Sequence, residues 1–201
     1  MKVAVVTGAA RGIGLAISKK FLEEGYLIAI LDIDQKTLSQ TMKQFFDTNN
    51  VLGLECDVSE PDQVDQAVNR VVEELGRIDM LVNNAGIAEF KPMLETTYEE
   101  WSRILAVNLN GPFICTQACA PFMLKNEGGS IVNIASISGL RASTLRIAYG
   151  TSKAALMHLT KQQAAELGNK GVRVNAIASG PVDTAMDKKP ILLTYDLTIM
   201  M

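Results

Sequence analysis

The chain has 201 residues, of which 48% are apolar and 20% charged, with a formal net charge of −3. The small negative charge gives no basic footprint for nucleic acid or for an anionic membrane surface. No apolar run approaches the roughly 18 residues of a membrane-spanning helix. We therefore expect a single domain over residues 1–201, with neither a nucleic-acid nor a membrane partner.

Cysteine and histidine usage gives no sign of a metal site. Cys56, Cys115 and Cys119 form no Cys-x-x-Cys pair. An odd count without metal-ligand spacing is typical of reduced thiols, so we expect a cytoplasmic protein. Cys115 and Cys119 are interpreted as small packing residues of one helix. The single histidine, His158, has no evident partner ligands, and we predict no metal.

Short β-branched runs alternate with longer stretches of helical period along the chain. The predicted strands cover 2–8, 27–32, 51–57, 79–86, 129–136 and 172–179. The predicted helices cover 12–25, 35–46, 61–76, 97–126 (with a break near 108–112) and 149–168. Because the strands are apolar throughout, they indicate a parallel sheet buried on both faces. Right-handed crossovers then give a doubly wound, Rossmann-type α/β fold with strand order 3-2-1-4-5-6.

A glycine-rich loop, TGAARGIG (7–14), follows the first predicted strand. Gly8 can form the tight turn, Gly12 lets the backbone approach a pyrophosphate, and Gly14 lets the helix pack closely on the sheet. The helix that begins around Ile13 presents N–H groups and the positive end of its dipole to phosphates. The alternative is a plain glycine turn.

The second strand ends in Asp32, at the distance from the loop where nucleotide-binding folds place an acidic residue. A carboxylate there accepts hydrogen bonds from the adenosine ribose and repels a 2′-phosphate, which favours NAD over NADP. Arg11 argues the other way, since a guanidinium can bind that phosphate. We give Asp32 more weight than Arg11 in choosing the cofactor, because a desolvated contact between its carboxylate and the 2′-phosphate of NADP would be costly. Asp34 is expected to be the N-cap of the next helix.

Tyr149 and Lys153 are four residues apart in AYGTSKAAL (148–156), so they share one face of a predicted helix. An ammonium beside a phenol favours the phenolate, which creates an acid/base group that works near neutral pH. The same spacing also fits a surface lysine beside a packing tyrosine. The remaining motifs decide between these two interpretations.

The order and spacing of the motifs resemble those of the short-chain dehydrogenase/reductase family from residue 2 to about residue 184. The matching segments are TGAARGIG (7–14), CDV (56–58), NNAG (83–86), NLNG (108–111), Ser136 in IASISG, YGTSK (149–153) and NAIASGPVDT (175–184). This resemblance implies an oxidoreductase that interconverts a secondary alcohol and a ketone of a small molecule by hydride transfer.

The resemblance also implies a catalytic set of Ser136, Tyr149, Lys153 and Asn108. Tyr149 would be the general base in oxidation and the general acid in reduction, while Lys153 would assist it and hold the nicotinamide ribose. Ser136 would bond the substrate oxygen, with Ser138 as a further contact. Asn108 would support a water that links Lys153 to solvent, or would only be a helix-breaking turn residue.

The same resemblance implies an NAD site, with NADP as the less favoured cofactor. The expected cofactor-binding residues are Gly8, Arg11, Gly12, Ile13, Gly14, Asp32, Ile33, Asp57, Val58, Asn84, Ala85, Gly86, Tyr149, Lys153, Pro181, Val182 and Thr184. Asp57 would bond the adenine amino group, and residues 180–184 would approach the nicotinamide. For NNAG (83–86), a plain strand-end turn is the alternative.

The sequence departs from the family pattern at Ser179-Gly180, where Pro-Gly is usual, and in residues 185–201, an atypical tail. We therefore expect the final edge strand to be missing and the sixth strand to be an open edge. Two alternatives to an NAD dehydrogenase follow, namely an NADPH-dependent 3-oxoacyl-[acyl-carrier-protein] reductase and a truncated nucleotide-binding protein with weak or no turnover. The resemblance further implies a homodimer or homotetramer.

Overall fold

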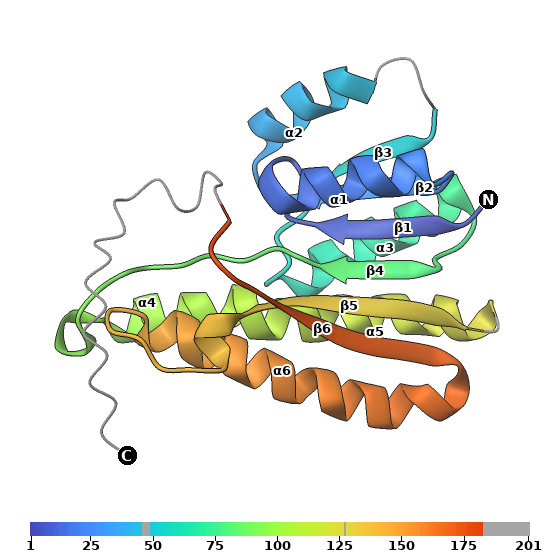
Figure 1. The fold of residues 1–201 in the computed structure, drawn as a ribbon. Coiled ribbons are helices and arrows are strands. Elements are labelled where there is room, and N and C mark those ends of the chain that lie inside the picture. Colours follow the sequence, from blue (N-terminus) through green and yellow to red (C-terminus); the bar gives the residue numbers. More distant parts are fainter. Residues whose placement is uncertain (46–48, 127, 183–201) are drawn as a thin grey trace.

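The computed structural model describes residues 1–45, 49–126 and 128–182. Their strands form one parallel sheet in the order β3-β2-β1-β4-β5-β6, which confirms the predicted Rossmann-type topology (Figure 1). The strands are β1 (Val3–Thr7), β2 (Leu27–Asp32), β3 (Val51–Glu55), β4 (Met80–Asn83), β5 (Gly129–Ser136) and β6 (Val172–Ser179). The predicted bounds of the last two strands are correct, whereas β3 and β4 end earlier than predicted and continue as loops.

Helices cover the two faces of this sheet and enclose two apolar clusters. One cluster lies under α1 and α2, and the other under α3, α5 and the C-terminal part of α6. The helices are α1 (Gly12–Glu23), α2 (Gln35–Met42), α3 (Pro61–Leu75), α4 (Tyr98–Leu105), α5 (Gly111–Lys125) and α6 (Ile147–Leu167). Short 3₁₀ turns are η1 (Lys43–Phe45), η2 (Met93–Glu95), η4 (Ile137–Gly139) and η5 (Gly168–Lys170).

Side chains at the helix ends explain most of these bounds. Asp34 caps α2, as predicted, by accepting a hydrogen bond from Thr37 N at 3.0 Å. Pro61 is the first residue of α3, where its missing N–H leaves no partner unsatisfied. At the start of α4, Thr97 and Glu100 form a reciprocal capping box.

The predicted helix break near 108–112 is wrong. The chain passes from α4 through one π-helical turn, η3 (Ala106–Asn110), directly into α5. Pro112 lies in the first turn of α5, where a proline is tolerated. Asn108 lies within the π turn and is fully buried. Single π turns occur often at functional sites, and this one lies at the edge of the sheet that is described below as the candidate site.

The prediction that every strand is buried on both faces is wrong for β6. Val172 and Val174 are buried in the cluster that includes α6, whereas Arg173, Asn175 and Ile177 are exposed. Within the described residues β6 pairs only with β5 and is therefore an edge strand. The predictions made for the tail, residues 185–201, and for a missing seventh strand lie outside the described residues.

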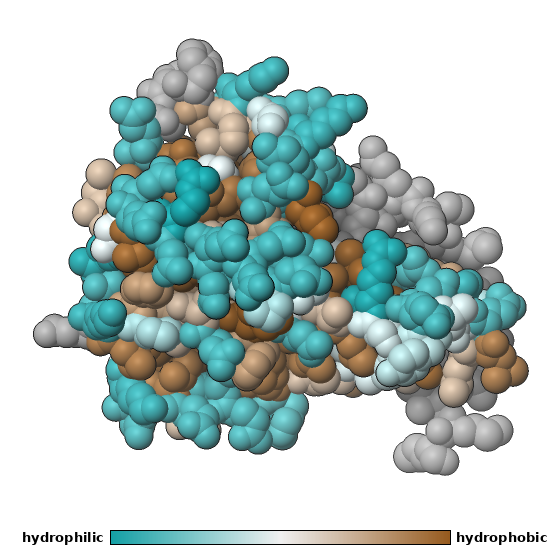
Figure 2. All heavy atoms as spheres, turned by 180° about the vertical axis from the view of Figure 1, so that it is seen from behind, coloured by the Kyte–Doolittle hydropathy of each residue, from teal (hydrophilic) through white to brown (hydrophobic). Residues whose placement is uncertain are grey.

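The surface carries no dominant feature on its rear side, where hydrophilic and apolar residues are interleaved (Figure 2). Among the helices of the described ranges, none is long and apolar enough to cross a membrane.

A buried polar network joins β4, β5 and α6 within the core. Asn83 Nδ2 donates to Asn133 Oδ1 at 2.8 Å, and Asn133 Nδ2 donates to Thr160 Oγ1 at 2.9 Å and to Gln163 Oε1 at 3.2 Å. Asn133 is completely buried. Buried polar groups stabilise a fold only while they remain paired, so this network depends on each of its members.

Replacing Asn133 with leucine should lower the free energy of unfolding by about 2–4 kcal/mol, because it removes the bond that the buried Gln163 Oε1 accepts and the shortest hydrogen bond of Asn83 Nδ2. Urea denaturation measures this loss. The matched control is Asn69→Leu on the exposed face of α3, which should change the stability by less than about 0.5 kcal/mol. Equal effects of the two substitutions would contradict the importance of the network.

Candidate functional site

The predicted site residues lie at the carboxyl edge of the sheet, beyond the ends of β1, β2, β4 and β5. In doubly wound folds this edge forms the ligand-binding crevice. The loops that leave these strands therefore determine what the crevice can hold (Figure 1).

The glycine-rich loop after β1 has no room for side chains at its key positions. Gly8 and Gly12 have φ angles of 60° and 57°, in the left-handed region that favours glycine. A Cβ on Gly8 would lie 2.7 Å from Ala85 Cα, and one on Gly14 would lie 2.5 Å from Gly8 O. The first turn of α1 contains no acidic side chain. A tight backbone cradle at a helix N-terminus fits the pyrophosphate of a dinucleotide.

Thr7 and Asn84 hold this loop against the end of β4. Thr7 Oγ1 accepts hydrogen bonds from Asn84 N and Ala85 N, both at 3.0 Å. Asn84 Nδ2 donates to Thr7 O and Gly8 O, both at 2.9 Å. The predicted cofactor residue Asn84 therefore uses its amide hydrogens to hold the loop. Thr7 was not predicted to hold the loop, although its position directly before Gly8 indicates such a role.

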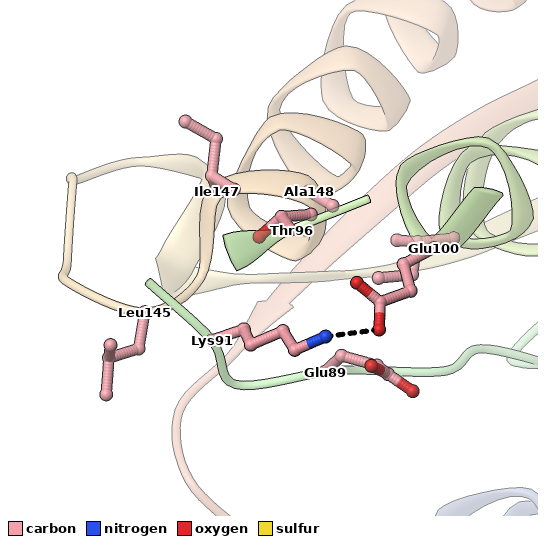
Figure 3. A pocket seen from close by; sticks show the side chains of 8 residues that line it. Glu89, Lys91, Thr96, Glu100, Leu145, Ile147 and Ala148 are labelled. Atoms are coloured by element: carbon pink, nitrogen blue, oxygen red, sulfur yellow. Dashed lines mark hydrogen bonds and ion pairs between the residues drawn. The ribbon is translucent and has the colours of Figure 1, made fainter. Parts of the chain in front are cut away.

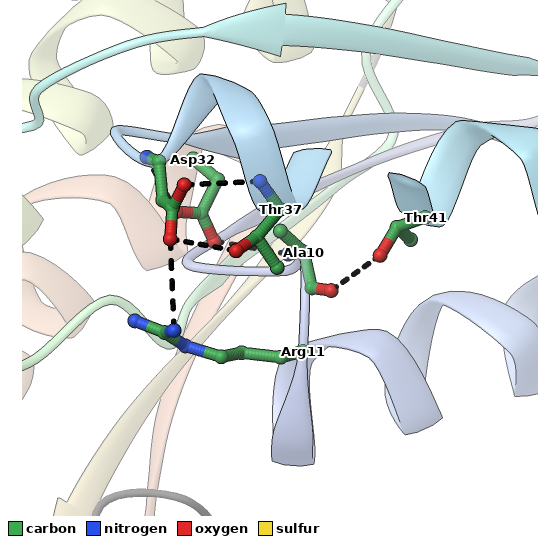
Figure 4. A network of polar contacts seen from close by, with 6 residues as sticks. Ala10, Arg11, Asp32, Thr37 and Thr41 are labelled. Atoms are coloured by element: carbon green, nitrogen blue, oxygen red, sulfur yellow. Dashed lines mark hydrogen bonds and ion pairs between the residues drawn. The ribbon is translucent and has the colours of Figure 1, made fainter. Parts of the chain in front are cut away.

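Asp32 lies at the end of β2 and is bonded to the same loop (Figure 4). Its Oδ2 accepts from Ala10 N and its Oδ1 from Asp34 N, both at 3.0 Å. The residue is 7% exposed, and each carboxylate oxygen can accept a further hydrogen bond. Thr41 Oγ1 donates to Ala10 O at 2.6 Å, so α2 also fixes this turn. A fixed carboxylate here fits the hydroxyls of an adenosine ribose.

The side chain of Arg11 lies beside Asp34. Its Nη1 is 3.6 Å from Asp34 Oδ2, in an exposed ion pair that Figure 4 shows. Thr37 donates to the Asp34 carboxylate through its hydroxyl and its N–H, and these bonds lower the pKa of Asp34. Asp34 therefore stays ionised and attracts the guanidinium of Arg11.

The remaining predicted cofactor contacts differ in exposure. Ile33 is 62% exposed, whereas Val58 is buried against Gly111. Asp57 Oδ1 accepts hydrogen bonds from the N–H and the hydroxyl of Ser59, at 2.9 and 2.7 Å. Pro181 and Val182 are exposed beyond β6, and the predicted contact Thr184 lies outside the described residues.

Lys153 and Tyr149 lie on the first turns of α6. Lys153 is 4% exposed, and its Nζ donates to Ile134 O at 2.8 Å and lies 5.8 Å from the centroid of the Tyr149 ring. Burial lowers the pKa of Lys153 to about 8, because removal from water disfavours the ammonium. The structure thus brings the predicted pair together on one face.

Ser136 ends β5 beside the same turns of α6. Its Oγ accepts a hydrogen bond from Ser138 N at 3.2 Å. The η4 turn packs tightly on α6, since a Cβ on Gly139 would lie 2.6 Å from Ala154 N and one on Gly150 3.0 Å from Ser138 O. This close packing fixes Ser136 next to the helix that carries Tyr149.

Asn108 joins the loop after β4 to α6. Its Oδ1 accepts from Ile87 N at 2.8 Å, and its Nδ2 donates to Ile87 O at 2.9 Å and to Ser152 Oγ at 3.1 Å. A Cβ on Gly86 would lie 3.3 Å from Asn108 Oδ1 and 3.5 Å from Lys153 Nζ. Gly86, Asn108 and Lys153 therefore meet at one point of the sheet edge.

A small pocket that was not predicted from the sequence lies between the loop after β4, α4 and the start of α6 (Figure 3). Lys91 N donates to Leu145 O at 2.9 Å, and Lys91 Nζ lies 2.5 Å from Glu100 Oε1. Hydrogen bonding to Glu100 raises the pKa of Lys91. The lining residues come from the loops after β4 and β5 and from the helices that follow them: Glu89, Lys91, Thr96, Glu100, Ile104, Leu145, Ile147 and Ala148.

The three cysteines and His158 are not among the residues described above at this edge of the sheet. All three cysteines are buried, as predicted for the packing residues Cys115 and Cys119, and burial raises the pKa of Cys56 and Cys119 to about 12. His158 is exposed, with its Nε2 3.2 Å from Gln162 Nε2. In residues 1–45, 49–126 and 128–182, no group of three His, Cys, Asp or Glu side chains could hold a metal ion.

The strand order, the glycine-rich loop and the acidic residue after β2 define a dinucleotide-binding protein of the Rossmann class. The chain belongs to the short-chain dehydrogenase family, whose sequence pattern, described as short chain dehydrogenase, matches residues 2–191. This family consists of oxidoreductases that act on alcohol and ketone groups, and the predicted family membership is confirmed.

Similar proteins carry several activities. The 3-oxoacyl-[acyl-carrier-protein] reductase FabG of Thermotoga maritima is 38% identical over 189 residues, which cover 94% of this chain and 77% of the relative. The 2-(R)-hydroxypropyl-CoM dehydrogenase of Xanthobacter autotrophicus is 40% identical, with coverage of 92% and 76%. The structure of a 3-ketoacyl-(acyl-carrier-protein) reductase from Brucella melitensis complexed with NADH has a TM-score of 0.88 at 29% identity, with coverage of 92% and 78%.

The free energy of unfolding should rise between pH 8 and pH 10.5, because the pKa of Lys153 is about 8 in the folded protein and 10.5 for an ordinary lysine. In this window the unfolded chain binds more protons, so stability increases with pH, by about 3 kcal/mol at most. Urea denaturation across this range measures the rise. Lys153→Met should remove it, whereas Lys161→Met, at an exposed position of α6, should keep it. If the free energy of unfolding depends on pH in the same way in all three proteins, burial does not lower the pKa of Lys153.

Proposed function

We propose that this protein is an NAD(H)-dependent oxidoreductase that interconverts a secondary alcohol and a ketone, with Ser136, Tyr149, Lys153 and Asn108 as its catalytic set. The observation that carries the proposal is the buried ammonium of Lys153 beside the Tyr149 ring, at the strand end where Ser136 lies. Family membership supports the reaction class, and the proposal adds the cofactor and the role of each residue.

Each side chain has a role that follows from its position. Tyr149 takes the hydroxyl proton of the alcohol in oxidation and returns it to the oxygen in reduction, and the Lys153 charge favours the phenolate. The Ser136 hydroxyl donates to the substrate oxygen and stabilises the charge that develops there. The nicotinamide cofactor, when bound, accepts or supplies the hydride. Asn108 holds the loop of Gly86 against Lys153 and so positions the ammonium.

The preference for NAD rests on Asp32 and on the position of Arg11. The buried Asp32 carboxylate is placed to accept ribose hydroxyls and would oppose a 2′-phosphate. Arg11, the cation on the loop that could bind that phosphate, is attracted to Asp34 instead. The Brucella melitensis neighbour, which was solved with NADH, supports an NAD(H) site in this fold.

An NADPH-dependent 3-oxoacyl-[acyl-carrier-protein] reductase is the second candidate. The Thermotoga maritima relative carries the name of that activity, and Arg11 is exposed on the cofactor loop. An exposed ion pair such as Arg11–Asp34 contributes little free energy, so a 2′-phosphate could compete for the guanidinium. The cofactor preference therefore separates an NADH-dependent from an NADPH-dependent enzyme, whereas turnover of a 3-oxoacyl substrate identifies a reductase, since the Brucella melitensis reductase was itself solved with NADH.

Tyr149→Phe should lower turnover by roughly 10² or more while changing NAD(H) affinity by less than about threefold, since it removes the transferable proton but keeps the ring. Steady-state kinetics with NADH and a panel of ketones measures turnover, and fluorescence titration measures binding. Tyr98→Phe, at a side chain that is 78% exposed, is the matched control and should leave both unchanged. Turnover retained in Tyr149→Phe would assign the proton transfer to another group.

NADH should bind at least about tenfold more tightly than NADPH, a difference of about 1.4 kcal/mol. Asp32→Ala should narrow this ratio, because it removes the charge that opposes the 2′-phosphate, even if the lost bond to Ala10 N weakens both cofactors. Asp65→Ala, on the exposed face of α3, should leave the ratio unchanged. Equal affinities of the unmodified protein for the two cofactors would favour the reductase candidate.

A further inference from the structure

The small pocket at the start of α6 has a wall made of two loops that are far apart in the sequence. Lys91 N, after β4, donates to Leu145 O, just before α6, at 2.9 Å. Leu145 has a φ of 62°, a left-handed conformation that is uncommon for a residue other than glycine. Such local strain persists where the surrounding structure holds it, often at ligand sites. The strained residue places its neighbour, Arg146, at the start of α6.

Arg146 lies between the two loops of this wall. Its guanidinium carbon is 4.6 Å from the centroid of the Phe90 ring, and its Nη1 lies 3.4 Å from Ser138 Oγ. Stacking on an aromatic face fixes the plane of the guanidinium and leaves its edge free to donate hydrogen bonds. Since Ser138 N donates to Ser136 Oγ, the cation is two hydrogen bonds away from the proposed catalytic serine.

The charge of Arg146 has no carboxylate partner within the part of the chain that the structure describes. The neighbouring cation of the wall, Lys91, is paired with Glu100. Glu89, the other carboxylate that lines the pocket, is exposed to solvent. A guanidinium carries five N–H donors, of which Arg146 uses one, in a long contact with Ser138. The remaining donors match the two oxygens of an anionic group.

We propose that Arg146 binds an anionic group of the substrate, so that the protein acts on a short hydroxy acid or oxo acid. The inference rests on the proposed function, because Tyr149 and Ser136 must hold the reacting oxygen. Arg146 is the N-cap residue of α6, three positions before Tyr149, and its contact with Ser138 places it near the end of β5, where Ser136 lies. We therefore expect a short substrate, in which few carbon atoms separate the reacting carbon from the anionic group.

The test compares an acid with its neutral analogue in the full chain. With NAD, the unmodified protein should oxidise 3-hydroxybutyrate with a higher kcat/KM than the methyl ester of the same acid. In Arg146→Met, which keeps an unbranched side chain but removes the guanidinium that stacks on Phe90, the acid-to-ester ratio of kcat/KM should fall at least about tenfold, mainly through KM. Arg146→Lys should restore part of this ratio. Arg141→Met, at an exposed arginine of the same loop, is the matched control and should keep it.

Hydroxyalkyl phosphates and sulfonates of the same length, tested in the same way, identify which anion fits best. An equal fall for the acid and the ester in Arg146→Met, or a preference of the unmodified protein for the ester, would show that Arg146 only supports the wall. Turnover of neither alcohols nor ketones would overturn the proposed function instead. In that case calorimetry with malonate and NADH still decides: binding that Arg146→Met abolishes supports the anion site, and binding that is absent or unchanged overturns it.

Discussion

The buried ammonium of Lys153 is the interaction on which the rest of the site depends. A cation that is 4% exposed must be compensated, and a carbonyl of the sheet, Ile134 O, accepts from it at 2.8 Å. Gly86 lies close by, since a Cβ there would be 3.5 Å from Nζ, an ordinary van der Waals distance. Its pKa of about 8 means that the charge is present near neutral pH, beside Tyr149, and can be given up at a small cost.

The position of β5 connects this ammonium to the reacting centre. Ile134 supplies the carbonyl that holds Lys153, and Ser136, two residues further along the same strand, supplies the hydroxyl proposed to bind the substrate oxygen. A one-residue slip of β5 would turn both groups to the wrong side, because strand side chains alternate with a period of two. The pairing of Asn83 with Asn133 fixes the register of β5 against β4. A buried polar pair in the core thus aligns a site at the sheet edge.

Patterns in the sequence were sufficient for the sheet order, for the cap of α2 at Asp34, for the start of α3 at Pro61, and for the bounds of β5 and β6. The π turn at Asn108 was not predictable, because asparagine, glycine and proline there also indicate a helix break. What keeps the turn helical is a pair of bonds to Ile87, far away in the sequence. The pocket wall was not predictable for the same reason, because it depends on a hydrogen bond between Lys91 and Leu145, which are far apart in the sequence.

The two sides of the crevice differ in how they are held, and this difference bears on specificity. On the side proposed to hold the cofactor, Asn84 and Asp32 are bound to the backbone of the glycine-rich loop, so a substitution there would disturb the loop itself. On the side proposed to hold the substrate, one backbone bond and the stacking of Arg146 on Phe90 join two loops. Residues on such loops can change without disturbing the sheet or the buried lysine. Relatives of similar identity to this chain can therefore share the fold and carry the names of different substrates.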